Sequence, residues 1–220
     1  MGKTSSRRFT PAAGRFVPTR VYDVGLSLLT REAVWRGELV DLLAVRPEES
    51  ILDVGCGTGS LAILLKRTVP SAVIVGLDPD PVALAIARKK SERSGMQVQW
   101  RQGFARDAAS HGTFDKVVSS LVFHQVTLPE KRSGLSAMFA AAQPDGWVYV
   151  VADYASQSHW LMRQLFRIVQ ALDGRTNTQP NADGFIEEEL SRIAGHAVRS
   201  DCLINTPTGT ISLFAVWNPA

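Results

Sequence analysis

Apolar and polar residues divide the middle of the chain into short segments that predict strands and helices in turn. Short, nearly continuous apolar runs are typical of strands buried on both faces, and most are followed by a segment whose apolar residues recur at helical spacing. This alternation indicates a parallel sheet with helices on both of its faces. The expected strands span residues 49–55, 71–78, 96–103, 114–122 and 147–154, and the expected helices span 60–69, 80–95 and 128–143.

The last third of the chain breaks this alternation. It begins with an amphipathic helix over residues 156–172, followed by a polar connection over 173–184 and a helix over 185–195. Two strand-like runs, 197–205 and 210–218, then follow with only four residues between them. A connection this short cannot cross over between parallel strands, so we expect these two strands to form an antiparallel hairpin.

Charge and composition exclude several classes of function. The net charge of the 220 residues is +3, and the basic groups are spread out except at Arg7–Arg8 and Arg88–Lys90. The second group lies near the end of an expected helix, where cations oppose the helix dipole, so a solvated helix end explains it better than nucleic acid does. Two distant cysteines and four scattered histidines give no metal-ligand spacing. No apolar run is long enough for a membrane span, and the N-terminus lacks the apolar core of a secretory signal, so we expect a cytoplasmic protein.

A glycine-rich loop follows the first strand. Gly55, Cys56, Gly57 and Gly59 stand between that strand and the next expected helix. Glycines let a ligand approach the backbone closely, and free N–H groups at the start of a helix attract electron-rich groups. These features predict a nucleotide-like ligand. The dinucleotide fingerprint G-x-G-x-x-G is not met, because Ser60 occupies the position of its third glycine.

Two acidic residues narrow the choice of ligand. Asp53 lies inside the end of the first apolar strand, where a carboxylate is unfavourable unless it meets a cation or hydrogen-bond donors. Asp78 ends the second strand and can accept hydrogen bonds from both hydroxyls of a ribose. A pyrophosphate would repel Asp53, whereas an ammonium group would satisfy it. S-adenosylmethionine supplies an ammonium group and a ribose without any phosphate.

The chain resembles the class I S-adenosylmethionine-dependent methyltransferases from about Tyr22 to its C-terminus. The motifs that carry the resemblance are "ILDVGCGTGSL", "VGLDPDP", "FDKVVSSLVFHQV" and "QPDGWVYVVADY", in the expected order. Within that superfamily the chain is most similar to the small-molecule methyltransferases of the ubiquinone and menaquinone biosynthesis type, which also begin with a helix carrying Tyr-Asp, here Tyr22-Asp23.

This resemblance implies a fold class and a division of the chain into a lid segment and a catalytic domain. The fold class is α/β: a Rossmann-like three-layer sandwich with a seven-stranded, mostly parallel sheet that ends in an antiparallel C-terminal hairpin. Residues 1–46 would form an N-terminal helical lid segment, and residues 47–220 the class I methyltransferase domain, with a lid insertion at about 155–184. For any single apolar residue of these lid segments, ordinary core packing is the stronger interpretation.

The resemblance also implies which residues hold the cofactor. One end of S-adenosylmethionine would contact the glycine loop, and the adenine would lie beyond the second and third strands. The family usually has Gly-Asp-Ala after the third strand, but here Phe104 replaces that Asp, so its ring either packs on adenine or fills core. Asp107 is a poor replacement because its register is wrong. The full cofactor-binding set is Tyr22, Asp53, Gly55, Cys56, Gly57, Gly59, Asp78, Pro79, Val82, Gly103, Phe104, Ser119 and Ser120.

The candidate catalytic residues follow the fourth and fifth strands. His124 should lie near the methyl end of the cofactor, where a side chain that titrates near neutrality suits a base or a group that orients the acceptor. A purely structural histidine is an equal alternative. Asp153 and Tyr154 would point toward the same opening, although Asp153 could instead cap a helix.

The function that we expect is methyl transfer from S-adenosylmethionine to a small organic acceptor at oxygen, carbon or nitrogen. The apolar lid segments suggest an aromatic or lipophilic acceptor. A catalytically repurposed S-adenosylmethionine-binding protein and, with less support, a nicotinamide-dependent oxidoreductase are the alternatives. The sequence does not fix the acceptor, and it leaves a homodimer open.

Overall fold

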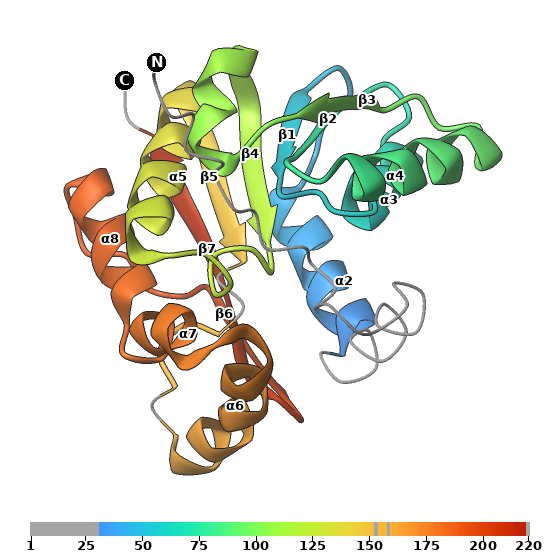
Figure 1. The fold of residues 1–220 in the computed structure, drawn as a ribbon. Helices are drawn as coiled ribbons and strands as arrows, with labels where there is room; N and C mark the ends of the chain where they lie inside the picture. The colour runs from blue at the N-terminus through green and yellow to red at the C-terminus, as the bar shows by residue number, and fades with distance from the viewer. Residues whose placement is uncertain (1–30, 152–153, 158, 219–220) are drawn as a thin grey trace, which may run out of the picture.

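A single seven-stranded sheet organises the computed structural model, which describes residues 31–151, 154–157 and 159–218 (Figure 1). The strand order is β3-β2-β1-β4-β5-β7-β6. Strands β1 to β5 run parallel, and β7 runs antiparallel to both of its neighbours, β5 and β6, which confirms the parallel sheet and the C-terminal hairpin. The strands are β1 Ser50–Val54, β2 Val73–Asp78, β3 Gln99–Gln102, β4 Phe114–Ser120, β5 Ala142–Val151, β6 Cys202–Thr206 and β7 Gly209–Asn218.

Helices cover both faces of this sheet and one of its ends. In Figure 1, α2, α3 and α4 lie on one side, α5 and α8 lie on the other, and α6 and α7 lie at the end toward which β4 points. The described helices are α2 Glu32–Leu43, α3 Ser60–Thr68, α4 Pro81–Arg93, α5 Leu128–Ala141, α6 Trp160–Asp173, α7 Arg175–Ala182 and α8 Phe185–Ala194, with a 3₁₀ helix, η1, at Ala105–His111. None of them has both the length and the apolar character needed to cross a bilayer.

Two apolar clusters fill the spaces between the layers. On one face, Phe139 of α5 and Leu190 of α8 pack against strand residues that include Leu52. On the other face, Trp35 of α2 and Leu65 of α3 pack in a second cluster. All but one of these side chains are almost completely shielded from solvent, and Phe139 is 7% exposed. The central strands are therefore buried on both faces, as their continuous apolar runs predict.

The boundaries of α4 agree with the local sequence signals. The Asp80 carboxylate accepts a hydrogen bond from the Val82 backbone N–H at 2.8 Å, and Pro81 occupies the first helical position. Gly95, with φ 66°, lies just after the helix. An N-cap acid, an N1 proline and a glycine in the left-handed region are favoured at these three positions, so this helix was predictable from its own residues.

Two segments differ from the sequence prediction. The polar stretch 173–184, expected to be a connection, contains helix α7, because Thr178, Asn181 and Ala182 share one face and are buried. The "PDG" segment, expected to be a turn before the fifth strand, falls within β5. Ala142 already pairs with Phe114, and the register shift before Lys116 accommodates the intervening residues.

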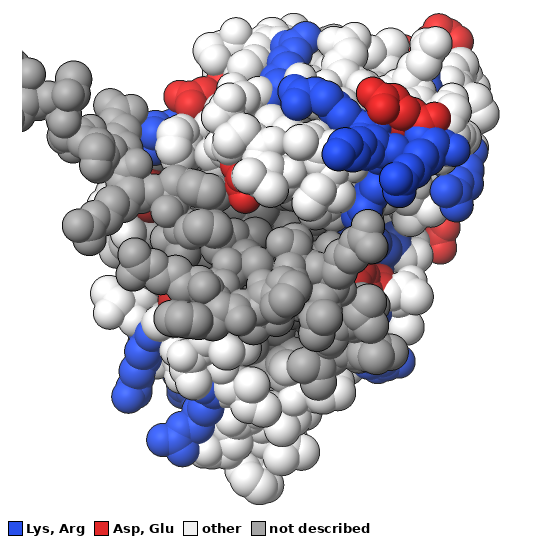
Figure 2. Space-filling model, turned by 45° about the vertical axis from the view of Figure 1, so that its right-hand side comes forward, with Lys and Arg blue, Asp and Glu red and all other residues white. Residues whose placement is uncertain are grey.

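Basic side chains gather over the side of the molecule that carries α3 and α4, with acidic side chains among them (Figure 2). Lys66 and Arg67 lie in the last turn of α3, and Lys90 and Arg93 in the last turn of α4. Cations at helix C-termini interact favourably with the helix dipole. Arg88 and Lys89 are exposed, as a solvated helix end predicts. Lys90 differs: it is partly buried, and its Nζ donates to Thr58 Oγ1 of the glycine loop at 2.7 Å.

Candidate active site

The candidate site lies where the strand order reverses, at the carboxyl ends of β1, β2 and β4. β1 pairs with β2 on one side and with β4 on the other, so Asp53, Asp78 and Ser119 come from three adjacent strands. In open sheets of this kind, ligands bind in the crevice at such a reversal. The sheet topology therefore brings together residues that were singled out from distant parts of the sequence.

The glycine loop between β1 and α3 adopts a backbone that favours glycine. Gly55, Gly57 and Gly59 have φ values of 72°, 53° and 77°, all in the left-handed region. A Cβ atom at Gly55 would lie 2.2 Å from Cγ2 of Val122, whereas one at Gly57 would meet no described residue within 4 Å. Packing therefore requires glycine at position 55, whereas the described residues leave space beside Gly57.

Gly59 has a role that the sequence did not reveal. A Cβ atom there would lie 2.3 Å from Cη2 of Trp100, and one at Gly76 in β2 would lie 2.5 Å from Cζ3 of the same indole. Both glycines therefore make room for Trp100, whose Nε1–H donates to Ser91 Oγ at 3.2 Å. The Sγ atom of Cys56 would also be within 2.9 Å of a Cβ at Gly76, so this side chain points toward β2.

Asp53 is the most unusual group in the site. Its side chain is fully buried, and neither carboxylate oxygen has a hydrogen-bond partner of good geometry among the described residues. Burial raises its pKa to about 7; the Arg36 guanidinium and the Ala62 backbone N–H partly oppose this shift, and nearby Asp78 reinforces it. A carboxyl group buried in this way is unfavourable unless a ligand supplies a cation or hydrogen-bond donors.

Asp78 is fixed in place by two backbone hydrogen bonds. Its Oδ2 accepts from the Gly57 N–H and its Oδ1 accepts from the Asp80 N–H, each at 2.8 Å. Burial raises its pKa, and these hydrogen bonds work in the opposite direction. Because a carboxylate oxygen can accept more than one hydrogen bond, both oxygens keep capacity for a ligand.

The side of the site beyond β2 and β3 combines apolar and aromatic groups. Val82, at the start of α4, is 63% exposed, which is high for an apolar side chain, and Pro79 is partly buried next to Asp78. The Arg106 guanidinium lies 4.1 Å from the centroid of the Phe104 ring. Asp107 accepts a hydrogen bond from the Phe104 N–H at 2.9 Å, which fixes the start of η1.

The remaining predicted site residues differ in burial and in their contacts. The Gly103 N–H donates to the Asp78 carbonyl at 3.1 Å, which ties β3 to β2. Ser119 is buried and its hydroxyl has no hydrogen-bond partner within the described part of the chain, whereas Ser120 is partly buried. Burial raises the pKa of the Cys56 thiol well above its usual value, so it stays protonated. Tyr22 and Asp153 lie outside the described residues.

His124 and Tyr154 come together near the C-terminal end of α6. The Nε2 atom of His124 lies 3.3 Å from Oδ2 of Asp173, the last residue of α6. The ring of Tyr154 meets His124 edge-on, with 5.5 Å between the centroids. The Tyr154 hydroxyl lies 2.7 Å from Oγ1 of Thr208 in the hairpin turn. The sequence analysis did not identify Asp173 as a site residue, because an acid followed by Gly174 looks like an ordinary helix end.

A second contact joins α7 to the loop that carries His124. The side-chain amide of Asn177, in α7, donates to the backbone carbonyl of Gln125 at 3.0 Å. His124 is only 4% exposed. The segment from α6 to α7 therefore covers the loop after β4 and supplies a carboxylate to it.

Proteins with similar sequences are described as methyltransferases. Residues 51–146 match the model of a family described as a methyltransferase domain. The demethylmenaquinone methyltransferase of Thermus thermophilus is 36% identical over 118 residues, 53% of this chain and 53% of that protein. The ribosomal protein L11 methyltransferase of Burkholderia orbicola is 37% identical over 127 residues, 53% of this chain and 41% of that protein. The chain thus spans about half the length of these curated relatives.

Solved structures agree with the fold. A magnesium protoporphyrin IX methyltransferase from Synechocystis PCC 6803 superposes with a TM-score of 0.68 at 18% identity, covering 93% of this chain and 90% of that one. An O-methyltransferase family protein from Burkholderia thailandensis gives a TM-score of 0.68 at 17% identity, covering 92% and 60%. At these identities the similarity establishes a Rossmann-like α/β fold.

Proposed function

We infer from the methyltransferase domain at residues 51–146 that this chain transfers a methyl group from S-adenosylmethionine to a small organic acceptor. The observation that carries this inference is the buried carboxylate of Asp53, whose oxygens accept no hydrogen bond of good geometry from the described residues. Such a group destabilises the fold unless a ligand supplies a cation or donors. S-adenosylmethionine provides an ammonium group for it, so the residues present fit this cofactor.

The cofactor-holding residues divide into three groups. Asp53 would accept from the ammonium, and the open face at Gly57 would allow the ligand close to the backbone. Asp78, held by two backbone N–H groups, would accept from the ribose hydroxyls. Exposed Val82 would cover one face of the adenine. When bound, S-adenosylmethionine supplies an electrophilic methyl group on a sulfonium.

The acceptor side would be built by His124 and the lid helices. Methyl transfer is an in-line displacement, so the protein contributes chiefly by alignment, and a base helps when the acceptor must lose a proton. His124 would orient the acceptor or remove its proton, and Asp173 would hold the imidazole in place. Tyr154 would support His124 through its ring edge. The insertion at about 155–184 would then act as a lid that favours an aromatic or lipophilic acceptor. Helix α2, which falls within the expected N-terminal lid segment 1–46, instead packs in the core against the sheet.

Calorimetry tests the cofactor assignment. We expect S-adenosylmethionine and S-adenosylhomocysteine to bind with micromolar affinity and NADH to show no heat of binding. Asp78→Asn should weaken S-adenosylhomocysteine binding by about 10-fold or more, because hydrogen bonds to a charged acceptor are strong. Binding of NADH but not of S-adenosylhomocysteine would contradict the proposal and support an oxidoreductase.

Transfer of a radioactive methyl group tests the reaction itself. Incubation with a panel of phenols, quinols and amines should give labelled product, and Asp173→Asn should reduce turnover while leaving S-adenosylhomocysteine affinity unchanged. The similarity to a ribosomal protein methyltransferase favours a second candidate, methylation of a protein. Labelling of ribosomal proteins but of no small molecule would replace the first acceptor class by the second. Cofactor binding with no transfer to either class would indicate a repurposed binding protein.

A further inference from the structure

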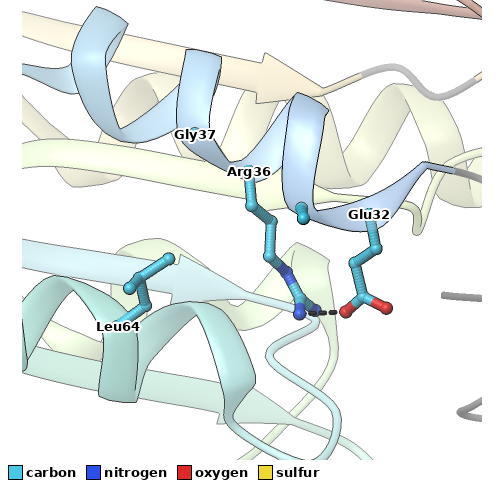
Figure 3. Close-up of a pocket in the computed structure, with 5 residues that line it drawn as sticks. Glu32, Arg36, Gly37 and Leu64 are labelled. Atoms are coloured by element: carbon cyan, nitrogen blue, oxygen red, sulfur yellow. Dashed lines mark ion pairs between the residues drawn. The ribbon is translucent and has the colours of Figure 1, made fainter.

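An open hollow of about 540 Å³ lies between α2 and α3, beside the glycine loop. Its described lining comprises Glu32, Ala33, Arg36 and Gly37 of α2 and Leu64 of α3. Figure 3 shows the side chains of Arg36 and Glu32 reaching from α2 toward the strand end and the loop beneath them, with their charged groups paired. The hollow therefore has a cation and an anion at one end and an apolar wall at the other.

The Arg36 guanidinium acts on the cofactor site electrostatically. Its positive charge lowers the pKa of Asp53, against the larger effect of burial. Among the described residues neither oxygen of Asp53 has a hydrogen-bond partner of good geometry, so Arg36 is close without binding this carboxylate. Arg36 instead forms an ion pair with Glu32, one helical turn earlier.

We propose that Arg36 binds the α-carboxylate at the amino-acid end of S-adenosylmethionine. In the protein without cofactor, the guanidinium pairs with the Glu32 carboxylate instead. An α-amino acid carries its ammonium and its carboxylate on a single carbon. Asp53 and Arg36 offer the two complementary charges at the same end of β1. This inference rests on the proposed function and adds a second charged contact, from a helix outside the family match at residues 51–146.

The chemistry of the three side chains supports an exchange of partners. A guanidinium is planar and permanently charged, and it holds carboxylates through paired N–H groups. The Glu32 carboxylate is thus a stand-in, within the chain, for the carboxylate of the ligand. Arg36 and Glu32 are 24% and 21% exposed, so both are accessible to a ligand without being fully solvated.

A simpler explanation is that the pair only stabilises α2. Residues four apart on a helix often form ion pairs, and such pairs contribute little stability. This explanation predicts that neither residue affects ligand binding. The two interpretations therefore differ in a property that binding measurements resolve.

The test compares two ligands that differ at the amino-acid end. S-adenosylhomocysteine has the ammonium and the carboxylate, whereas 5′-methylthioadenosine has neither. We expect Arg36→Gln to raise the Kd of S-adenosylhomocysteine by about 10- to 100-fold, the loss typical of a charge-assisted hydrogen bond, and to change the Kd of 5′-methylthioadenosine by less than about 2-fold. Glu32→Gln should tighten S-adenosylhomocysteine binding a few-fold, because a competitor for the guanidinium is removed.

The controls separate local from general effects. Arg93→Gln removes an equal charge from the exposed end of α4 and should leave both affinities unchanged. If Arg36→Gln fails to fold, Arg36→Lys keeps the charge without the paired N–H groups and should lose part of the S-adenosylhomocysteine affinity. Equal effects of Arg36→Gln on both ligands, or no effect on either, would overturn this inference while leaving the proposed function intact. Failure of the unmodified protein to bind S-adenosylhomocysteine would instead overturn the proposed function.

Discussion

Replacing Asp53 by Asn should stabilise the ligand-free protein at neutral pH and weaken its binding of S-adenosylhomocysteine. The carboxyl group is fully buried, and its pKa rises from 3.8 to about 7, chiefly because burial disfavours the charged form. In the unfolded chain the same group would titrate at its ordinary value. The folded state therefore binds a proton that the unfolded state releases over this pH range.

The sign of the effect follows from this difference. Asp53 contributes fully to the free energy of unfolding below pH 3.8, and this contribution falls as the pH rises from 3.8 to about 7. Above pH 7 the loss is constant at about 4 kcal/mol. Asn cannot ionise, so the variant escapes this loss. Relative to the original protein, its advantage should be about 2 kcal/mol at pH 5 and about 4 kcal/mol at pH 7.5, offset by a constant term for its own buried amide.

Urea unfolding monitored by circular dichroism measures this advantage. The constant term cancels when the difference in unfolding free energy is compared between pH 5 and pH 7.5, so the quantity to examine is its increase of roughly 2 kcal/mol. Calorimetry at pH 7.5 should show at least a 10-fold weaker affinity of the variant for S-adenosylhomocysteine. A stability difference that does not change with pH would refute the reasoning, because Asp53 would then be ionised in the folded protein.

Further substitutions test the packing of the loop and of the helices beside it. Gly55→Ala should destabilise the protein by about 2–4 kcal/mol, because the new methyl group would collide with Val122. Gly57→Ala should cost only about 1 kcal/mol, because its backbone lies in the left-handed region. Thermal unfolding of the two variants measures the difference in stability. Trp100→Ala should cost about 3–5 kcal/mol because it leaves a cavity, and urea unfolding should show a lower midpoint. Asp80→Ala should cost about 1 kcal/mol through loss of the α4 cap; a loss below about 0.3 kcal/mol would mean that the observed hydrogen bond contributes nothing.

The parts of the fold that follow from local residues were predictable. The cap at Asp80, the alternation that builds β1 to β5 and the short connection before β7 each depend on neighbours in the sequence. Asp53 and Asp78 were also identified, because an acid at the end of an apolar run stands out whatever surrounds it. Their position on adjacent strands required only the usual topology of such sheets.

The parts that were missed depend on partners far away in the chain. Helix α7 has a polar sequence containing Pro180, and its buried face is defined by contacts that no local pattern contains. Asp173 belongs to the candidate site only because it contacts His124, which lies 49 positions earlier. Arg36 belongs to it only because its charge acts on Asp53. Side-chain pairs of this kind arise when the chain folds, so single-sequence reasoning has no signal for them.

The indole of Trp100 packs between the glycine loop and the middle of β2. Its neighbours Gly59 and Gly76 lie on different elements, and each would place a methyl group inside the ring's van der Waals surface if it were Ala. These three positions are therefore expected to change as a set: a sequence with a larger residue at 59 or 76 should carry a smaller one at 100. Engineering that opens this side of the loop would have to begin by shrinking the ring.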